Sequence, residues 1–143
     1  MPIKDYSTKV DVFSTLGEIQ GLLVKHGAKK VLQEFDDDGN VVSVSFMINT
    51  PMGMQAVRLP ANVDAVQKTL VKQRVKADRE QAQRVAWRIV KDWVAAQMAI
   101  LESQMVSMDE IFLPYMLNNP ATGETVYQLF VQNQLLVGGG NNE

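Results

Sequence analysis

The sequence contains no cysteine and only one histidine, and these shortages exclude several kinds of site. Without thiols there is no disulfide, no thiolate metal ligand and no cysteine nucleophile. One histidine cannot form a histidine-based metal site, and neither a phosphate-binding loop nor a nucleophile elbow is present. His26 precedes Gly27 at the end of a predicted helix, where it would cap the negative end of the helix dipole. We therefore expect no catalytic residue, no metal, no cofactor and no enzymatic activity.

Long hydrophobic runs are also missing. The most apolar stretch, residues 93–101, is nine residues long and includes Gln97, whereas a membrane span needs about 18 apolar residues. The first residues, Met1 to Tyr6, have no apolar segment of the kind found in signal peptides. We therefore expect a cytoplasmic protein with no membrane partner.

Hydrophobic residues make up 46% of the 143 residues and charged residues 21%, which is typical of a folded domain. The length fits one domain. We place this domain at residues 1–137. The segment 138–143, which contains only Gly, Asn and Glu, is predicted to be a flexible tail.

The first half of the chain predicts a helix followed by an antiparallel β-meander. Asp11 or Ser14 caps the helix, whose apolar residues recur every three to four positions, and Gly27 ends it. Strands are expected over 30–35, 41–49 and 54–59, because turn sequences separate them and the middle segment alternates in polarity. The acidic run 36–38 lies in the first of these turns, and its spacing does not fit a calcium loop.

The second half predicts helices. The expected segments are 62–75, a long helix over 78–105, a short helix from Ser107 that Pro114 ends, and a last helix over 124–136. The fold class is therefore α+β: an N-terminal helix, a three-stranded antiparallel β-meander, and a C-terminal set of helices with one long central helix. In that long helix, Trp93 is expected to point inward.

Charge is distributed unevenly along the chain, although the net charge is only -2. Residues 61–100 hold eight basic and four acidic side chains, and residues 101–143 hold five acidic side chains and no Lys or Arg. At helical spacing, three of the basic residues share a face of the long helix and two share a face of the preceding one, so they are candidates for contacts to nucleic-acid phosphates. These five candidate residues are Lys68, Lys72, Arg84, Arg88 and Lys91. The alternative is a solvated face, with ion pairs Glu80–Arg84 and Arg88–Asp92.

The second half of the long helix, residues 93–101, is apolar nearly all round. Such a helix must be covered on several sides. It is either the central helix of the domain or part of a contact with another chain, and we expect a homo-oligomer, specifically a homodimer formed through the C-terminal helices.

Four stretches of the sequence resemble a family of short, mostly uncharacterised proteins encoded by phages, prophages and integrative elements of bacteria. The stretches cover residues 23–30, 57–60, 78–93 and 110–115, and the third reads Asp78-Arg79-Glu80-Gln81-Ala82-Gln83-Arg84-Val85-Ala86-Trp87-Arg88-Ile89-Val90-Lys91-Asp92-Trp93. The resemblance implies a mobile-element setting and assigns no activity and no site residue.

Residues 13–75 also follow the element order of a double-stranded RNA-binding domain: helix, three strands, helix. That family places lysines at the start of its second helix, where this chain has Pro60 to Asp64 instead. The similarity therefore extends to topology only.

Two functions remain open at this point. The first is a nucleic-acid-associated accessory protein of a phage or mobile element, which contacts DNA or RNA through the five basic residues. The second is an adaptor or inhibitor that docks on a host or defence protein. Aromatic residues beside the basic stripe are scarce, since Trp87 is the only one within it, and single-strand binding usually needs such residues.

Overall fold

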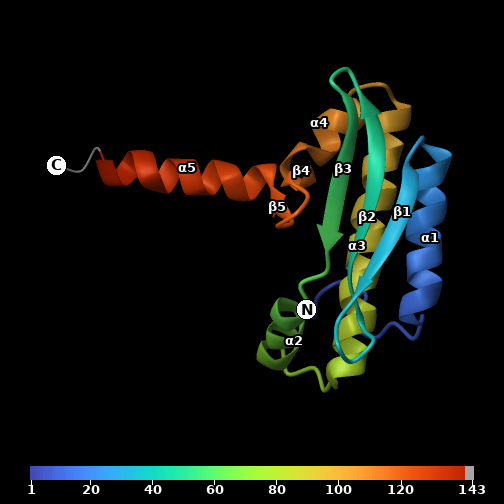
Figure 1. Cartoon of the computed structure of the whole chain (residues 1–143). Coiled ribbons are helices and arrows are strands. Elements are labelled where there is room, and N and C mark those ends of the chain that lie inside the picture. Colours follow the sequence, from blue (N-terminus) through green and yellow to red (C-terminus); the bar gives the residue numbers. More distant parts are fainter. Residues whose placement is uncertain (141–143) are drawn as a thin grey trace.

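Through α4 the chain folds with the element order expected from its sequence (Figure 1). The computed structural model describes residues 1–140, with side chains through Asn133; residues 141–143 lie outside the described part. The elements are α1 (Val12–Lys25), β1 (Lys29–Phe35), β2 (Val41–Thr50), β3 (Gly53–Pro60), α2 (Val63–Lys72), α3 (Arg79–Glu102), α4 (Met108–Phe112), the 3-10 turn η1 (Leu113–Tyr115), β4 (Leu117–Asn119), β5 (Glu124–Thr125) and α5 (Val126–Gly140). With 48% helix and 23% strand, the fold class is α+β, which confirms the prediction.

Helix α1 begins and ends at the residues that the sequence indicated. The carboxylate of Asp11 accepts a hydrogen bond of 2.6 Å from the amide of Ser14, so Asp11 is the N-cap. His26 is the C-cap, and Gly27 follows it with φ of 103°, a left-handed conformation that glycine adopts without strain.

The strands β1, β2 and β3 form one antiparallel sheet in that order. The turn between β1 and β2 contains Gly39 at φ of 80°, and the carboxylate of Asp36 accepts hydrogen bonds from the amides of Asp38 and Asn40. The predicted alternation in polarity along β2 is confirmed, since Val44, Phe46 and Ile48 are buried on one face of the sheet.

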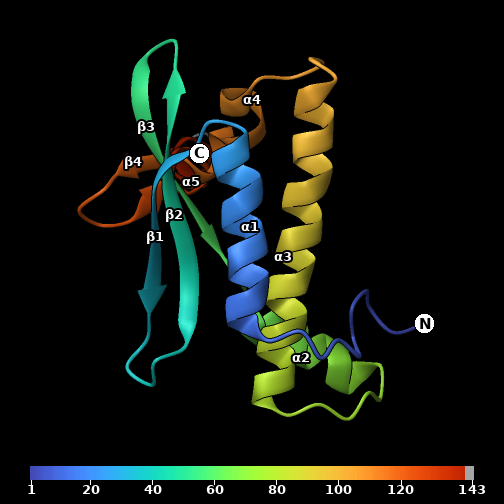
Figure 2. The same ribbon diagram turned by 90° about the vertical axis from the view of Figure 1, so that its right-hand side faces the viewer.

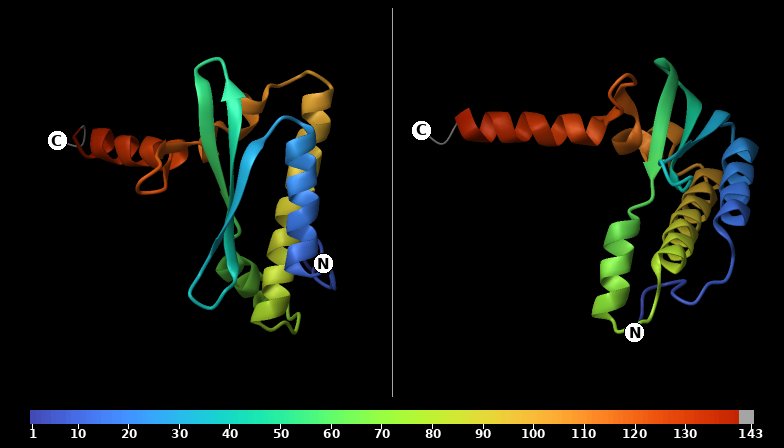
Figure 3. Two further views of the ribbon diagram at one scale, coloured as in Figure 1. Left: turned by 45° about the vertical axis from the view of Figure 1, so that its right-hand side comes forward. Right: turned by 60° about the horizontal axis from the view of Figure 1, so that its bottom comes forward.

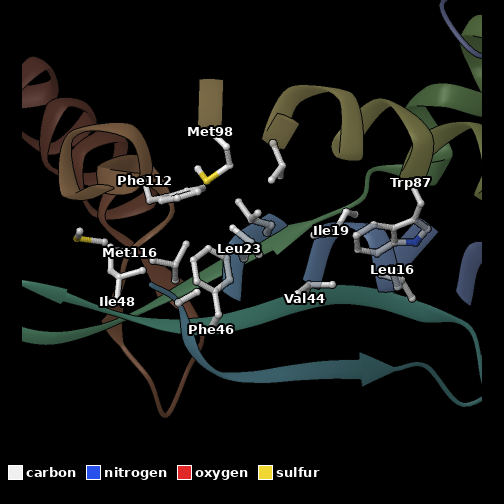
Figure 4. Packing of buried hydrophobic residues seen from close by; sticks show 14 of the residues in the cluster. Leu16, Ile19, Leu23, Val44, Phe46, Ile48, Trp87, Met98, Phe112 and Met116 are labelled. Carbon is white, nitrogen blue, oxygen red and sulfur yellow. The ribbon is translucent and has the colours of Figure 1, made fainter. Parts of the chain in front are cut away.

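Helices α1 and α3 lie next to each other on this apolar face, as the edge-on view shows (Figure 2). Their contact residues and those of the sheet form the main core (Figure 4). At one end of the core, Phe46 and Phe112 pack edge to face with ring centroids 5.1 Å apart. The buried members include Leu16, Ile19, Leu23, Val44, Phe46, Ile48, Trp87, Met98, Phe112 and Met116.

The two tryptophans of α3 differ in burial. Trp87 is fully buried, whereas Trp93 is half-buried at the edge of the core and packs edge to face on Phe112 and Tyr115. Trp93 therefore points inward as expected. The apolar second half of α3 lies against other elements of the same chain, with Val94 and Met98 in the main core. This segment no longer requires another chain to cover it, and homodimer formation stays a prediction.

A second, smaller cluster joins α2 to the N-terminal half of α3. Its buried residues are Leu70, Ala82 and Val85, and Ile3 from the N-terminal segment packs against them. The backbone amide of Ile3 also donates a 2.8 Å hydrogen bond to the side chain of Gln73. The N-terminal segment is thus held across α3, near α2 (Figure 2).

The C-terminal part contains one element pair that the sequence reading missed. The sequence predicts no strand after Pro114, but β4 and β5 form a short hairpin, and β5 takes the first two residues of the helix expected over 124–136. The last helix, α5, extends away from the rest of the chain (Figures 1 and 3). It runs to Gly140, so residues 138–140 of the expected flexible tail are helical, and the remaining residues 141–143 of that tail lie outside the described part.

Candidate binding surfaces

The five basic candidates do not form one continuous stripe. Arg84, Arg88 and Lys91 lie on the side of α3 that faces α1 and the N-terminal segment, whereas Lys68 and Lys72 lie on α2. Helix α2 packs on a different side of α3, through Ala82 and Val85. The N-terminal segment crosses α3 near both groups, and the side chain of Gln81 donates hydrogen bonds to its carbonyl oxygens.

Arg88, the central residue of the α3 group, is occupied by contacts within the chain. Its guanidinium forms an ion pair with Glu18 of α1 and lies 3.3 Å from the hydroxyl of Thr15, which is itself buried. Only 15% of the Arg88 side chain is exposed. The expected helical pair Arg88–Asp92 is wrong, because Asp92 pairs with Lys4 at 3.0 Å instead.

The other two α3 residues are also half-buried. Arg84 donates a 2.8 Å hydrogen bond to Gln81, so the expected pair with Glu80 is not the contact formed. Lys91 lies 3.8 Å from Asp92, with about a fifth of its side chain exposed. Of the three, Arg88 joins α3 to α1, whereas the contacts of Arg84 and Lys91 are within α3.

Trp87, the one aromatic residue within the basic stripe, is not available for base stacking. It is fully buried, and its indole nitrogen donates to the carbonyl of Val41. In contrast, Lys68 and Lys72 are exposed on α2, and Arg74 and Lys76 are exposed in the loop after it. The accessible part of the predicted basic surface is therefore this end of the molecule.

The outer face of the sheet forms an open groove of about 1050 Å³ with the β4–β5 hairpin and the first turns of α5. At its centre lies a polar network. The carboxylate of Glu34 accepts hydrogen bonds from Ser43 at 2.6 Å and from Arg58 at 2.9 Å, and a longer one from Ser45. These donors, Ser43 first and Arg58 next, lower the pKa of Glu34 below its ordinary value. All three bonds go to the same oxygen, Oε1, and 42% of the Glu34 side chain is exposed.

His26 is the only imidazole, and it too is engaged. Nδ1 lies 2.7 Å from the carbonyl of Leu22, and Nε2 lies 2.8 Å from the carboxylate of Glu102. Both ring nitrogens therefore face oxygen atoms. His26 thus joins the C-terminal ends of α1 and α3. Among the residues through Asn133, no group of three or more acidic or histidine side chains could hold a metal ion.

Helix α5 presents an uncharged surface. The segment from Thr125 to Asn142 contains no Lys, Arg, Asp or Glu. Its start is fixed by a reciprocal capping arrangement, in which the amide of Thr125 donates to the Gln128 side chain and the amide of Gln128 donates to the Thr125 hydroxyl. The spacing Thr-x-x-Gln in the sequence is the signal for this start, and the sequence reading did not use it.

The two faces of α5 differ in character. Gln128 and Gln132, one turn apart, line the polar groove over the sheet. Tyr127 and Phe130 each have 59% of their surface exposed. Within the chain, α5 is in contact chiefly with η1, β4 and β5, all at its first turns. An aromatic face is thus left uncovered on a helix that projects into solvent.

A small apolar notch lies at the junction of β3, α3 and η1. It has a volume of about 260 Å³. Its lining residues are Leu59, Pro60, Ile89, Val90, Trp93 and Tyr115. None of them is charged, and of the side chains described, none from α5 contributes to the notch. It lies beside the base of α5, because Tyr115 precedes Met116, whose carbonyl accepts a 2.8 Å hydrogen bond from the amide of Val126.

Comparison with protein-family models, with curated proteins and with solved structures finds no match for this chain. The resemblance to phage and mobile-element proteins therefore stays a prediction. Among the helices of the described residues, none is both long enough and apolar enough to cross a membrane.

Proposed function

We propose that the protein is a non-enzymatic binding module that acts through protein–protein contact, with α5 as its contact element. The observation that carries this proposal is the uncovered aromatic face of Tyr127 and Phe130 on an uncharged, projecting helix. Large aromatic side chains dominate the binding energy of protein interfaces, and charged residues are depleted at interface centres. This corresponds to the adaptor or inhibitor function, in a phage or mobile-element setting.

The absence of enzymatic activity belongs to the same proposal. The groups that could act as bases, Glu34 and His26, are each held by internal hydrogen bonds. A catalytic site needs a nucleophile or reacting group within reach of a free base. The Ser43 hydroxyl that bonds Glu34 is fully buried, and the nitrogens of His26 face a carbonyl and a carboxylate. These contacts support the proposal that neither group belongs to an active site.

Site-specific photo-crosslinking tests the protein-contact function. A benzophenone amino acid replaces Phe130 in the full chain, and the matched control replaces Phe13, which is equally exposed on α1. After irradiation in the cells that make the protein, a protein adduct at position 130 but not at position 13 is expected. Equal adducts at both positions, or none at position 130, would contradict the proposal.

Nucleic-acid association is the second candidate, because four basic residues stand exposed close together in sequence. Lys68 and Lys72 on α2, with Arg74 and Lys76 after it, could neutralise several backbone phosphates. In this version of the hypothesis, Arg84, Arg88 and Lys91 support α3 and do not contact DNA or RNA.

A further inference from the structure

The chain carries both halves of one apolar contact. One half is the aromatic face of α5, and the other is the notch of Leu59, Pro60, Ile89, Val90, Trp93 and Tyr115. We propose that α5 of one copy packs on the notch of a second copy, and that the exchange is reciprocal. The inference rests on the proposed protein-contact function and names its partner as this same chain.

The notch matches the aromatic face in size and chemistry. An enclosed apolar cavity of about 150 Å³ is enough to bind benzene, and the notch measures about 260 Å³. One phenyl ring from Phe130 therefore fits. An aromatic ring gains from edge-to-face contact with other rings, and both Trp93 and Tyr115 line the notch.

The charge pattern favours a second copy over a charged partner. In the reciprocal contact the helix of each copy meets the notch of the other, so a charge on either surface would be buried without a partner on the uncharged other surface. The segment from Thr125 to Asn142 has no charged residue, and the notch has none. Two copies can therefore approach along these surfaces without electrostatic cost.

The position of the notch beside the base of α5 allows a closed pair. The helix leads away from its own notch, since the described α5 side chains do not line it. Phe130 lies four residues after Val126, the first residue of α5, and so about 6 Å from the start of the helix. In a twofold pair the two helices therefore cross near their starts, with Phe130 of each copy in the other copy's notch and the later turns of each helix on the other copy's body. Both notches and both α5 helices (the arms of the dimer) are then covered at once, and the assembly closes at two copies.

The surface area buried by this exchange is larger than the area that two α5 helices would bury by pairing only with each other. The helix has 15 residues, so it is about 22 Å long and about 10 Å across, with a lateral surface of roughly 700 Å². If half of each arm is covered by the partner's body, the total buried surface is roughly 1,400 Å², which is within the range of stable interfaces. Two arms packed only on each other would bury roughly half of that, below the usual minimum.

Single-cysteine chains test the exchange, because the natural sequence has no cysteine to interfere. One chain, labelled with ¹⁵N, carries Asn133→Cys, one turn from Phe130 on α5. The other, unlabelled, carries Pro60→Cys at the rim of the notch. Both replaced residues are exposed, and both aromatic residues of α5 remain. The control replaces Pro60→Cys with Gln20→Cys, an exposed position on α1.

Under mild oxidation the mixed pair 133 with 60 is expected to form a disulfide on the order of tenfold faster or more than 133 with 20, because bound partners share a millimolar effective concentration. Adding Phe130→Ser to the labelled chain should remove this excess, and adding Leu32→Ser, at an equally exposed site on the sheet, should not. Mass spectrometry measures directly how much of the disulfide-linked dimer joins one labelled and one unlabelled chain.

Three results would overturn the inference. The first is a mixed disulfide no faster than the control. The second is faster self-pairing of Asn133→Cys, which would mean that the arms pair without the notch. The third is an intrachain disulfide in the double variant Pro60→Cys/Asn133→Cys, which would mean that α5 folds back on its own chain. If the photo-crosslinker at position 130 still captures a different protein in those cases, the proposed function survives and only the identity of the partner fails.

Discussion

The indole Nε1 of Trp87 lies 3.3 Å from the carbonyl oxygen of Val41 and donates a hydrogen bond to it. Trp87 comes from the first half of α3 and Val41 begins β2, so the bond joins the central helix to the central strand. Both residues are buried. A carbonyl at the start of a strand thereby obtains its partner inside the core, where an unpaired polar group would be costly.

Replacing Trp87 with alanine is expected to destabilise the fold strongly. Large aromatic truncations in cores cost about 3–5 kcal/mol, and Val41 would also lose its donor. Trp93→Ala should cost less, because Trp93 is half-buried at the edge of the core. Urea denaturation of both variants measures the difference. A Trp87→Ala cost no larger than that of Phe13→Ala, at an exposed site, would contradict this account.

Nucleic-acid binding, if present, should depend on α2 and not on Arg88. Lys68→Ala and Lys72→Ala are each expected to reduce the slope of log affinity against log salt by about 1. Arg88→Ala should leave that slope unchanged and lower the free energy of unfolding, since it breaks the pair with Glu18. Titration with duplex and single-stranded DNA and RNA across salt, alongside denaturation, separates the two effects. A slope that falls only in Arg88→Ala would restore the original stripe on α3.

The hydrogen bonds to Glu34 predict that Ser43→Ala lowers the stability of the fold by an amount that depends on pH. The pKa of Glu34 is held below its ordinary value chiefly by the Ser43 hydroxyl. The network therefore stabilises the fold fully at pH values above the ordinary pKa of a glutamate, and this stabilisation is lost as pH falls through the lowered pKa. Ser43→Ala should raise the Glu34 pKa, seen by NMR titration of its side-chain carboxyl. The stability difference from wild type should be larger at about pH 6 than at about pH 3. Ser45→Ala, which removes the longer 3.4 Å bond, serves as the control and should shift the pKa less.

Asp5→Asn should stabilise the protein at neutral pH. Burial, first, and the neighbouring carboxylate of Asp92 raise the pKa of Asp5, so ionised Asp5 is unfavourable in the folded state once pH exceeds its ordinary value. An amide removes the charge beside Asp92, and asparagine tolerates the left-handed backbone at position 5, where φ is 64°. The gain should fade as pH falls and Asp5 becomes protonated. Asp92→Asn, which loses the ion pair with Lys4, should instead destabilise; thermal unfolding of the two variants at several pH values compares them.

The sequence predicted most of the fold because its local signals are strong and independent. Asp11 accepts the capping hydrogen bond expected of it, and Asn62 and Asp78 cap the helices expected to begin there. Gly27 and Gly39 take the positive φ values that their turns need. The alternation in β2 fixed which face is buried.

The candidate site was predicted less well, for a physical reason. Helical spacing places Arg84, Arg88 and Lys91 on one face, but it does not say what that face meets. The partner of Arg88 is Glu18, 70 residues away, and the partner of Asp92 is Lys4 in the N-terminal segment. Such long-range pairs follow from tertiary packing, which periodicity in one segment does not encode. The projection of α5 likewise depends on the β4–β5 hairpin, whose strands are too short to give a pattern.

Sedimentation equilibrium of the full chain over a wide concentration range tests the central claim most directly. The account predicts a species of twice the 16.0 kDa chain mass that dissociates on dilution. Phe130→Ser should shift this equilibrium to the monomer, and Leu32→Ser, at an equally exposed site, should leave it unchanged. A wild-type chain that sediments at 16.0 kDa at every concentration would contradict the claim that a second copy covers α5.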